Sequence, residues 1–282
     1  MKYRHAYHAG NFADVHKHVT LMTLIEAMQR KDKGFLFLDT HAGSGSYELH
    51  GSRASTPHES QTGYARIGDH KFRAEELQRY IARVDAFRQR MQNSAGYPGS
   101  PVIAAEMLRS QDRGIFVEQI AAEARALERA LPPHSAARVE TGDGFATLRA
   151  TLPPPERRGL VHIDPPYEET QQDFGRVGMA INDALRRFQT AVIAAWYPIK
   201  DARDIASWHA SLAKGIANET LVGELWLFPC DSRVALNGSG VLIVNPPYQI
   251  EERMRAWLPE LHSRLDTAKT GGWRVRTLAQ PV

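Results

Sequence analysis

Residues 159–167 read Gly-Leu-Val-His-Ile-Asp-Pro-Pro-Tyr. The apolar run Leu160–Ile163 is typical of a buried strand, and the tetrapeptide 164–167 follows it directly. Two consecutive prolines cannot continue a sheet or enter a helix interior, so the chain must leave the strand in a stiff, extended turn. In an open sheet of parallel strands, ligands bind beyond the carboxyl ends of the strands. We therefore expect this turn at the functional edge of an α/β fold.

The turn combines three groups that suit a flat base with an exocyclic amine. The carboxylate of Asp164 and the free carbonyl of Pro165 can each accept one N–H, and the ring of Tyr167 offers a stacking surface. The tetrapeptide is typical of enzymes that methylate amino nitrogens on bases. We take Asp164, Pro165 and Tyr167 as the candidate catalytic residues.

Short apolar strands alternate with helical patterns on both sides of this turn. This alternation predicts a doubly wound α/β fold with a seven-stranded, mostly parallel sheet. The two last strands are joined by a loop too short for a helix, so we expect them to be antiparallel. The predicted strands are Gly34–Asp39, Gly114–Gln119, Arg138–Thr141, Leu160–Ile163, Thr190–Trp196, Gly223–Phe228 and Gly240–Val244, and the predicted helices are Asp14–Arg30, Pro101–Leu108, Ile120–Leu131, Phe145–Leu152, Phe174–Phe188, Ile205–Ala217 and Glu251–Leu265.

The polar stretch Tyr47–Tyr97 interrupts the alternation. It contains one amphipathic helix, Ala74–Met91, and we interpret it as a small helical subdomain inserted after the first strand. This interpretation divides the chain into a main domain, residues 1–46 and 98–282, and an insertion, residues 47–97. An elaborated crossover without a function of its own is the alternative.

Composition narrows the class of protein. The chain has 282 residues, 43% of them hydrophobic, which is typical of a folded α/β domain rather than a disordered chain. A single cysteine, Cys230, excludes an internal disulfide and a Cys-rich metal site, and we expect no metal. There is no long apolar run and no signal-peptide pattern, so we expect a cytoplasmic protein without a membrane segment. The net charge of +3 permits a nucleic-acid partner without requiring one.

Ligand-type turns follow the other early strands as well. The turn Thr40–Gly45 carries Gly43 and Gly45 but lacks the third glycine of the dinucleotide fingerprint, which favours S-adenosylmethionine over a pyrophosphate cofactor. Glu118, at the end of the next strand, can accept ribose hydroxyls. Asp143 and Gly144, after the third strand, can reach an adenine amine. Each turn is weak evidence alone, but the four strand ends together favour a nucleotide-like cofactor.

Three other patterns receive a simpler interpretation. Asn245-Pro246-Pro247-Tyr248 repeats the proline turn after the last strand, away from the expected cofactor crevice, and we interpret it as a rigid strand exit. Cys230 follows a proline, as in enzymes that methylate cytosine at C5, but it falls in a late loop and is more simply a plain thiol. The zinc-deaminase pattern is absent.

The N-terminal segment is rich in histidine and aromatic residues. Tyr3 and Arg4 suit RNA through base stacking and phosphate pairing. Lys17 and His18 open the first helix and could meet a cofactor carboxylate. A solvated N-terminal arm is the alternative.

These motifs, taken in order, resemble the bacterial family of ribosomal RNA large subunit methyltransferase J, 23S rRNA adenine-N6 methyltransferases. The matching segments are Tyr3-Arg-His, His8-Ala-Gly-Asn, Asp14-Val, Lys17-His18, Leu38-Asp-Thr-His-Ala-Gly-x-Gly, Tyr97-Pro-Gly-Ser100-Pro, Gly142-Asp-Gly-Phe, Ile163-Asp-Pro-Pro-Tyr, Trp196-Tyr-Pro, Asn245-Pro-Pro, Leu258-Pro and Leu261-His-Ser. Ser44 stands where the family usually has Ala, and Tyr248 where a relative has Trp. The insertion matches least.

The resemblance implies a Rossmann-like, monomeric enzyme that uses S-adenosylmethionine and acts on 23S rRNA, either free or in an assembly intermediate. It implies Asp164 as the catalytic residue and Tyr3 as an RNA contact. The residues that it implies at the cofactor are His18, His41, Ser100, Glu118, Asp143, Gly144 and Asp164.

Two other functions stay open at this point. The same turn serves DNA adenine-N6 and cytosine-N4 methyltransferases, but these need a larger region to read a duplex. A non-enzymatic RNA-binding protein on a degenerate fold of this type is the other, and the intact Asp164 and glycine turn disfavour it.

Overall fold

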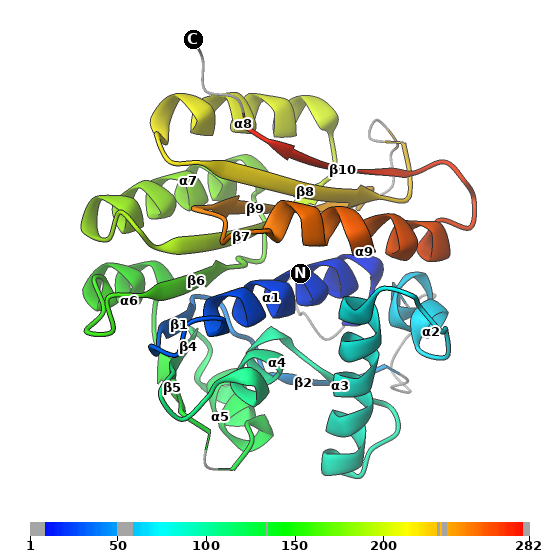
Figure 1. Cartoon of the computed structure of the whole chain (residues 1–282), viewed down its shortest axis with the longest axis horizontal. Coiled ribbons are helices and arrows are strands. Elements are labelled where there is room, and N and C mark those ends of the chain that lie inside the picture. The colour runs from blue at the N-terminus through cyan, green and yellow to red at the C-terminus, as the bar shows by residue number, and fades with distance from the viewer. Residues whose placement is uncertain (1–8, 50–58, 134, 230–231, 233–235, 279–282) are drawn as a thin grey trace.

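An eight-stranded sheet with helices on both faces is the framework of the protein (Figure 1). The structure is a computed structural model and describes residues 9–49, 59–133, 135–229, 232 and 236–278. The strands run in the order β10-β8-β9-β7-β6-β1-β4-β5. Their bounds are β1 Leu36–Asp39, β4 Arg113–Glu118, β5 Ala137–Thr141, β6 Gly159–Ile163, β7 Val192–Ile199, β8 Thr220–Trp226, β9 Gly238–Val244 and β10 Gly272–Thr277.

The five strands from β5 to β7 are parallel, and β9 runs antiparallel between β7 and β8. The predicted Rossmann-like α/β fold and the antiparallel pairing of the last two predicted strands are confirmed. The predicted number of seven strands is wrong, because β10 adds an antiparallel edge strand beside β8. Only Val275 of β10 is buried, so this strand lacks the buried apolar run that marks most of the other strands.

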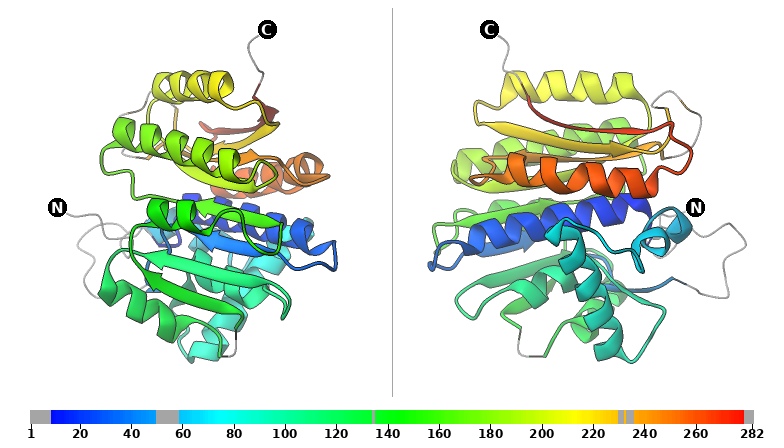
Figure 2. Two further views of the ribbon diagram at one scale, coloured as in Figure 1. Left: turned by 90° about the vertical axis from the view of Figure 1, so that its left-hand side faces the viewer. Right: turned by 45° about the vertical axis from the view of Figure 1, so that its right-hand side comes forward.

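Helices cover the two faces in two layers (Figure 2). Side chains of the first layer share one apolar cluster, and those of the second layer share another. The first layer is α1 Phe12–Gln29, α4 Ser100–Met107, α5 Ala121–Ala130 and α9 Ile250–Leu265. The second layer is α6 Gly144–Thr151, α7 Thr170–Arg187 and α8 Ala202–Gly215.

Helix α1 is buried along almost its whole length. It lies against the sheet and is itself packed by α3, α4 and α9, so even its charged residues Asp14 and Lys17 are buried. The side chain of Asn11 caps its first turn by accepting the Asp14 N–H at 2.9 Å. A charged side chain on a buried helix is stable only where an opposite charge or a hydrogen-bonding group lies next to it.

The segment after β1 packs on this first layer. It contains β2 Ser46–Glu48, a 3₁₀ turn Glu59–Thr62, α2 Tyr64–Ile67, α3 Glu75–Met91 and β3 Gly96–Pro98. Strands β2 and β3 pair antiparallel, so the chain leaves and re-enters the main fold through one two-stranded ribbon. The predicted helix Ala74–Met91 is confirmed as α3. Its aromatic and aliphatic residues belong to the same apolar cluster as α1, and the division into two domains stays a prediction.

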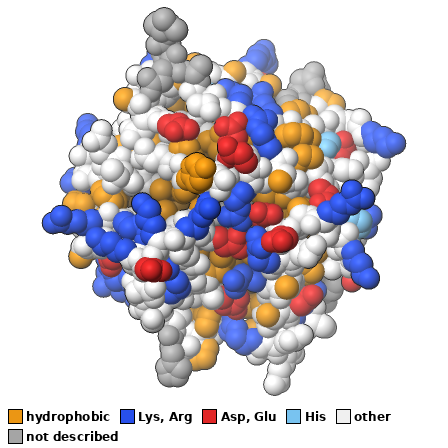
Figure 3. Space-filling model, in the orientation of Figure 1, with side chains coloured by type: hydrophobic (Ala, Val, Ile, Leu, Met, Phe, Trp, Pro, Cys, Tyr) orange, Lys and Arg blue, Asp and Glu red, His pale blue; other side chains and the backbone are white. Residues whose placement is uncertain are grey.

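Ion pairs also join α3 to the main layer. Arg79 of α3 and Arg253 of α9 both bind Glu26 of α1, and Arg253 contacts Glu76 at 3.0 Å. Basic and acidic side chains accordingly lie side by side in the middle of the face in Figure 3. In the described part of the chain, no helix is long and apolar enough to cross a bilayer.

Candidate active site

The sheet order brings four predicted turns to one edge. Strands β6, β1, β4 and β5 are neighbours and parallel, so the segments that leave their carboxyl ends lie in a row. These segments hold Asp164, the turn 40–45, Glu118 and Asp143. The sequence predicted each turn at a strand end, and the strand order confirms that they are adjacent.

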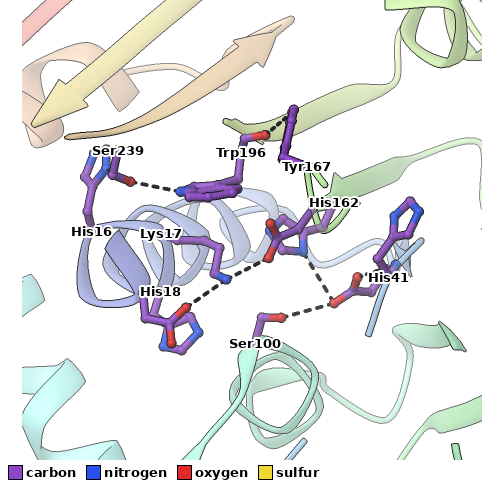
Figure 4. Close-up of polar contacts among 12 residues, drawn as sticks. His16, Lys17, His18, His41, Ser100, His162, Tyr167, Trp196 and Ser239 are labelled. Atoms are coloured by element: carbon purple, nitrogen blue, oxygen red, sulfur yellow. Dashed lines mark hydrogen bonds and ion pairs between the residues drawn. The ribbon is translucent and has the colours of Figure 1, made fainter. Parts of the chain in front are cut away.

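Asp164 is held by a buried lysine from the first helix. Lys17 Nζ lies 2.6 Å from Asp164 Oδ2 and 2.9 Å from Asp14 Oδ1, and Figure 4 shows Lys17 reaching from α1 to the turn after β6. The Lys17 side chain is 5% exposed and that of Asp164 12%. Burial alone would lower the Lys17 pKa, but the two carboxylates outweigh it and hold the pKa well above its usual value. Lys17 is therefore a permanent cation, and its partners are the protein's own carboxylates.

Asp39, which the sequence did not single out, anchors the end of β1 next to this pair. It is fully buried, and its Oδ2 lies 3.3 Å from His162 Nδ1 and 3.3 Å from the Ser100 hydroxyl that donates to it. Burial would raise the Asp39 pKa, but the His162 contact and the donated His41 N–H hold it below its usual value. Ser100, at the start of α4, is thus tied to the edge where the turns meet.

Glu118 ties the glycine turn to the end of β4. Its Oε2 accepts the Gly43 N–H at 2.9 Å, and its Oε1 accepts the Ile120 N–H at 2.7 Å. Gly43 and Gly45 have φ of 65° and 73°, a left-handed conformation that side chains disfavour. The predicted acid therefore stands directly beside the predicted glycine turn.

Asp143 caps α6 at the end of β5. Its Oδ1 accepts the Phe145 N–H at 2.8 Å and the Ala146 N–H at 3.2 Å, while the side chain stays exposed. A Cβ on Gly144 would lie 1.8 Å from the Thr40 carbonyl oxygen, so only glycine permits this approach of α6 to β1. The two turns are therefore pressed against each other.

Two histidines flank the row of turns. The ring of His41 lies edge-on to Phe145 at 4.9 Å, and mainly burial lowers its pKa. His18 is buried beside Lys17, stacks on Tyr97 at 5.7 Å and shares a 3.2 Å hydrogen bond with its hydroxyl. His18 thus faces the aromatic residues at the end of the 47–97 segment.

Tyr167 is buried, whereas the sequence led us to expect a ring that is free to stack on a base. Its side chain is 2% exposed, packs on Phe174 and Trp196, and donates its hydroxyl to the Trp196 carbonyl at 2.6 Å. Its ring holds the turn and offers no free face for stacking. The ring of Trp196 lies beside the ion pair, with Lys17 Nζ 5.6 Å from its centre.

The second proline turn lies at the opposite edge. Because β9 is antiparallel to β7, Val244 pairs with Ile193 at the start of β7. The Asn245 amide donates to the carbonyls of Gln189 and Ala191 at 2.9 and 2.8 Å. This agrees with the interpretation as a strand exit. Two other predictions cannot be placed, since Tyr3 and Arg4, like Cys230, lie outside the described residues.

Comparisons with known proteins agree on one family. A family model described as ribosomal RNA large subunit methyltransferase D, RlmJ, matches residues 32–279. The chain is 42% identical to ribosomal RNA large subunit methyltransferase J of Escherichia coli over 96% of both proteins. It is 36% identical to the protein of the same name from Haemophilus influenzae over 98% of both. A crystal structure of a Legionella pneumophila protein superposes with a TM-score of 0.85 at 31% identity, covering 97% of this chain and 99% of that one.

Proposed function

Because the chain belongs to the ribosomal RNA large subunit methyltransferase J family, we propose that it transfers a methyl group from S-adenosylmethionine to the N6 amine of an adenine in 23S rRNA. The observation that carries the proposal is the turn at Asp164. Its carboxylate lies at the carboxyl edge of β6, is fixed by a buried cation and stands next to the glycine turn.

The residues at this edge fit S-adenosylmethionine. Gly43 and Gly45 give the turn after β1 its left-handed backbone, Glu118 offers a carboxylate to ribose hydroxyls, and exposed Asp143 can accept from an adenine amine. His18, His41 and Ser100 line the same row of turns and complete the proposed cofactor site. The bound cofactor supplies an electrophilic methyl group on a sulfonium.

The turn acts on the substrate amine through two acceptors. The adenine amine is a weak nucleophile because its lone pair is delocalised into the ring. Asp164 and the Pro165 carbonyl would accept its two N–H groups and draw the nitrogen toward a tetrahedral geometry. Lys17 occupies Oδ2 of Asp164 and leaves Oδ1 for the amine. Because Lys17 stays charged, it positions the carboxylate and does not act as a base. Most of the rate would come from orientation and electrostatics.

The flipped base needs an aromatic wall, and the buried ring of Tyr167 is not free to supply it. Trp196, half-buried beside Lys17, is the described aromatic residue in that position. We assign Tyr3 and Arg4 to RNA binding from the sequence. We propose that the protein acts as a monomer.

The test is methyl transfer to 23S rRNA by Asp164→Ala. We expect transfer from labelled S-adenosylmethionine to disappear while cofactor affinity stays within a few-fold of wild type. Asn245→Ala, in the matching turn at the other edge, is the control and should retain the wild-type kcat per folded molecule at saturating RNA. Turnover by Asp164→Ala, or loss in Asn245→Ala alone, would refute the assignment. Equal methylation of duplex DNA would favour the DNA alternative.

A further inference from the structure

Tyr248 is the most exposed large hydrophobic side chain among the described residues. It is 79% exposed, at the sheet edge opposite Asp164, where the methyl-transfer site makes no use of it. A side chain this exposed contributes little to the core, so packing does not explain an aromatic ring here.

The ring stands on a rigid base. Asn245 has a left-handed φ of 52°, and its side chain is fully engaged, since Oδ1 also accepts Asn218 Nδ2 at 2.9 Å. The Ile250 N–H then returns to the Pro247 carbonyl at 3.1 Å, which starts α9. With its amide used in this way, Asn245 cannot hold a base amine as Asp164 can. The turn therefore presents one aromatic ring in a fixed place.

One arginine packs on the ring, and two exposed lysines follow that arginine closely in the sequence. The Arg30 guanidinium lies 5.8 Å from the Tyr248 ring centre, and its Nη1 donates to Gln249 Oε1 at 3.0 Å. Lys31 and Lys33 follow directly and are exposed, with Asp32 as the one acid between them. The turn that follows α1, residues 30–34, lies at the left of Figure 1, and Lys and Arg side chains gather on that side of Figure 3.

Two further arginines hold this basic turn in place. Arg109 donates to the carbonyls of Gln29 and Lys31, and Arg158 donates to those of Met28 and Lys33. These carbonyls belong to the end of α1 and the turn after it, so both guanidinium groups are engaged in fixing the backbone. Arg30 thereby lies against the ring, and Lys31 and Lys33 extend from the same fixed turn.

We propose that Tyr248, Arg30, Lys31 and Lys33 form a second RNA contact, an aromatic-basic patch that takes an unpaired nucleotide of the substrate RNA. One ring face carries the Arg30 guanidinium, the other stacks a base, and Lys31 and Lys33 bind phosphates. The inference rests on the proposed function for its RNA. A protein partner is the other possible occupant, and the experiment below separates it from RNA.

The patch adds a length requirement to the substrate. It lies across the sheet from Asp164, and the eight-residue strand β7 spans about 25 Å. An RNA that carries only the target nucleotide and its neighbours therefore cannot reach both places. We expect the patch to strengthen binding of long RNA and to leave short RNA unaffected.

The experiment measures RNA affinity and turnover with two RNAs. One is a full-length 23S rRNA transcript, and the other is the shortest fragment that the wild type still methylates. Tyr248→Ala should weaken binding of the long RNA about tenfold, raise its KM and leave kcat unchanged, while Tyr248→Trp keeps the affinity. Replacing both Lys31 and Lys33 with Gln should reduce the slope of log affinity against log salt by about 1.5. Met179→Ala, which truncates a 63% exposed side chain on α7, is the matched control.

Wild-type affinity of Tyr248→Ala for the long RNA would overturn the proposal. So would a defect seen only with ribosomal particles and not with naked transcript, which would assign the patch to a protein. Failure of the proposed function is distinguishable. The wild type would then methylate neither the 23S transcript nor ribosomal particles, while the affinity measurements still decide whether the patch binds RNA.

Discussion

Replacing Lys17 with methionine tests the charge that holds the candidate catalytic turn. Methionine keeps most of the side-chain volume and removes the cation from between Asp14 and Asp164. Breaking a buried ion pair by removing one partner costs about 3–5 kcal/mol. Asp14 keeps its bond from the Gly10 N–H, and Asp164 is partly exposed, so both carboxylates retain some compensation. We therefore expect about 3 kcal/mol.

The expected shift in melting temperature follows from chain length. An unfolding entropy of about 2.1 cal/mol/K per residue gives about 0.6 kcal/mol/K for 282 residues, and hence a Tm lower by about 5 °C. The folded-state pKa of Lys17 is raised, so its contribution is complete below the unfolded value of about 10.4 and is lost only as pH rises through the folded value. The difference between variant and wild type should thus be constant from pH 6 to 9.

Scanning calorimetry and methyl-transfer kinetics measure the two consequences. A misplaced Asp164 should lower kcat about 10- to 100-fold while cofactor affinity changes little. In a double-mutant cycle, Lys17→Met and Asp164→Asn together should cost about 1–3 kcal/mol less than the sum of the single changes. Additive effects, or a Lys17→Met enzyme with wild-type kcat, would refute the positioning role.

Three further changes probe the surrounding structure. Gly144→Ala should destabilise the fold and abolish cofactor binding, because its Cβ would meet the Thr40 carbonyl; a wild-type melting curve and titration would contradict this. Asp143→Ala removes the cap of α6, so urea unfolding should show a loss of about 1 kcal/mol and S-adenosylmethionine should bind more weakly; Asp143→Asn should recover the stability. Burial lowers the pKa of His16 to about 3, so between pH 6.5 and 3 the unfolded chain binds a proton at His16 and the folded chain does not. The free energy of unfolding should therefore decrease by about 1.4 kcal/mol for each unit by which the pH is lowered in this range. In urea melts, His16→Gln should reduce this dependence of stability on pH, and the same dependence as in the wild type would reject the assignment.

The sequence predicted the elements whose signals are local. Each strand with a continuous apolar run was identified, and the four turns at 40–45, Glu118, Asp143 and Asp164 were assigned to one edge, because parallel strands separated by helices end at the same edge of the sheet. The edge strand Gly272–Thr277 was missed, since it alternates Trp273 and Val275 with Arg274 and Arg276 and has no continuous apolar run. Edge strands bury one face at most and leave a weak pattern.

The contacts that complete the site are not local, which is why the sequence did not reveal them. Nothing near Lys17 indicates that its partner is Asp164, and nothing near Asp39 indicates His162 or Ser100. The sequence predicted Tyr167 as a stacking surface, but the ring is buried. Phe174 and Trp196 from other elements pack on it, and this packing leaves no local signal in the sequence. Residue types and strand order were enough to predict which turns form the site. The burial of Tyr167 and the pairing of Lys17 with Asp164 became visible only in the tertiary structure.

The ion pair between Lys17 and Asp164 joins residues 147 positions apart, and this separation matters during translation. At about 5–20 residues per second, the lysine leaves the ribosome roughly 7–30 s before its aspartate. Until Asp164 has been made, Lys17 lacks one of its two carboxylate partners, and α1 cannot be buried on the sheet at full stability. The nascent enzyme therefore gains its working carboxylate geometry only after more than half of the polypeptide has been made.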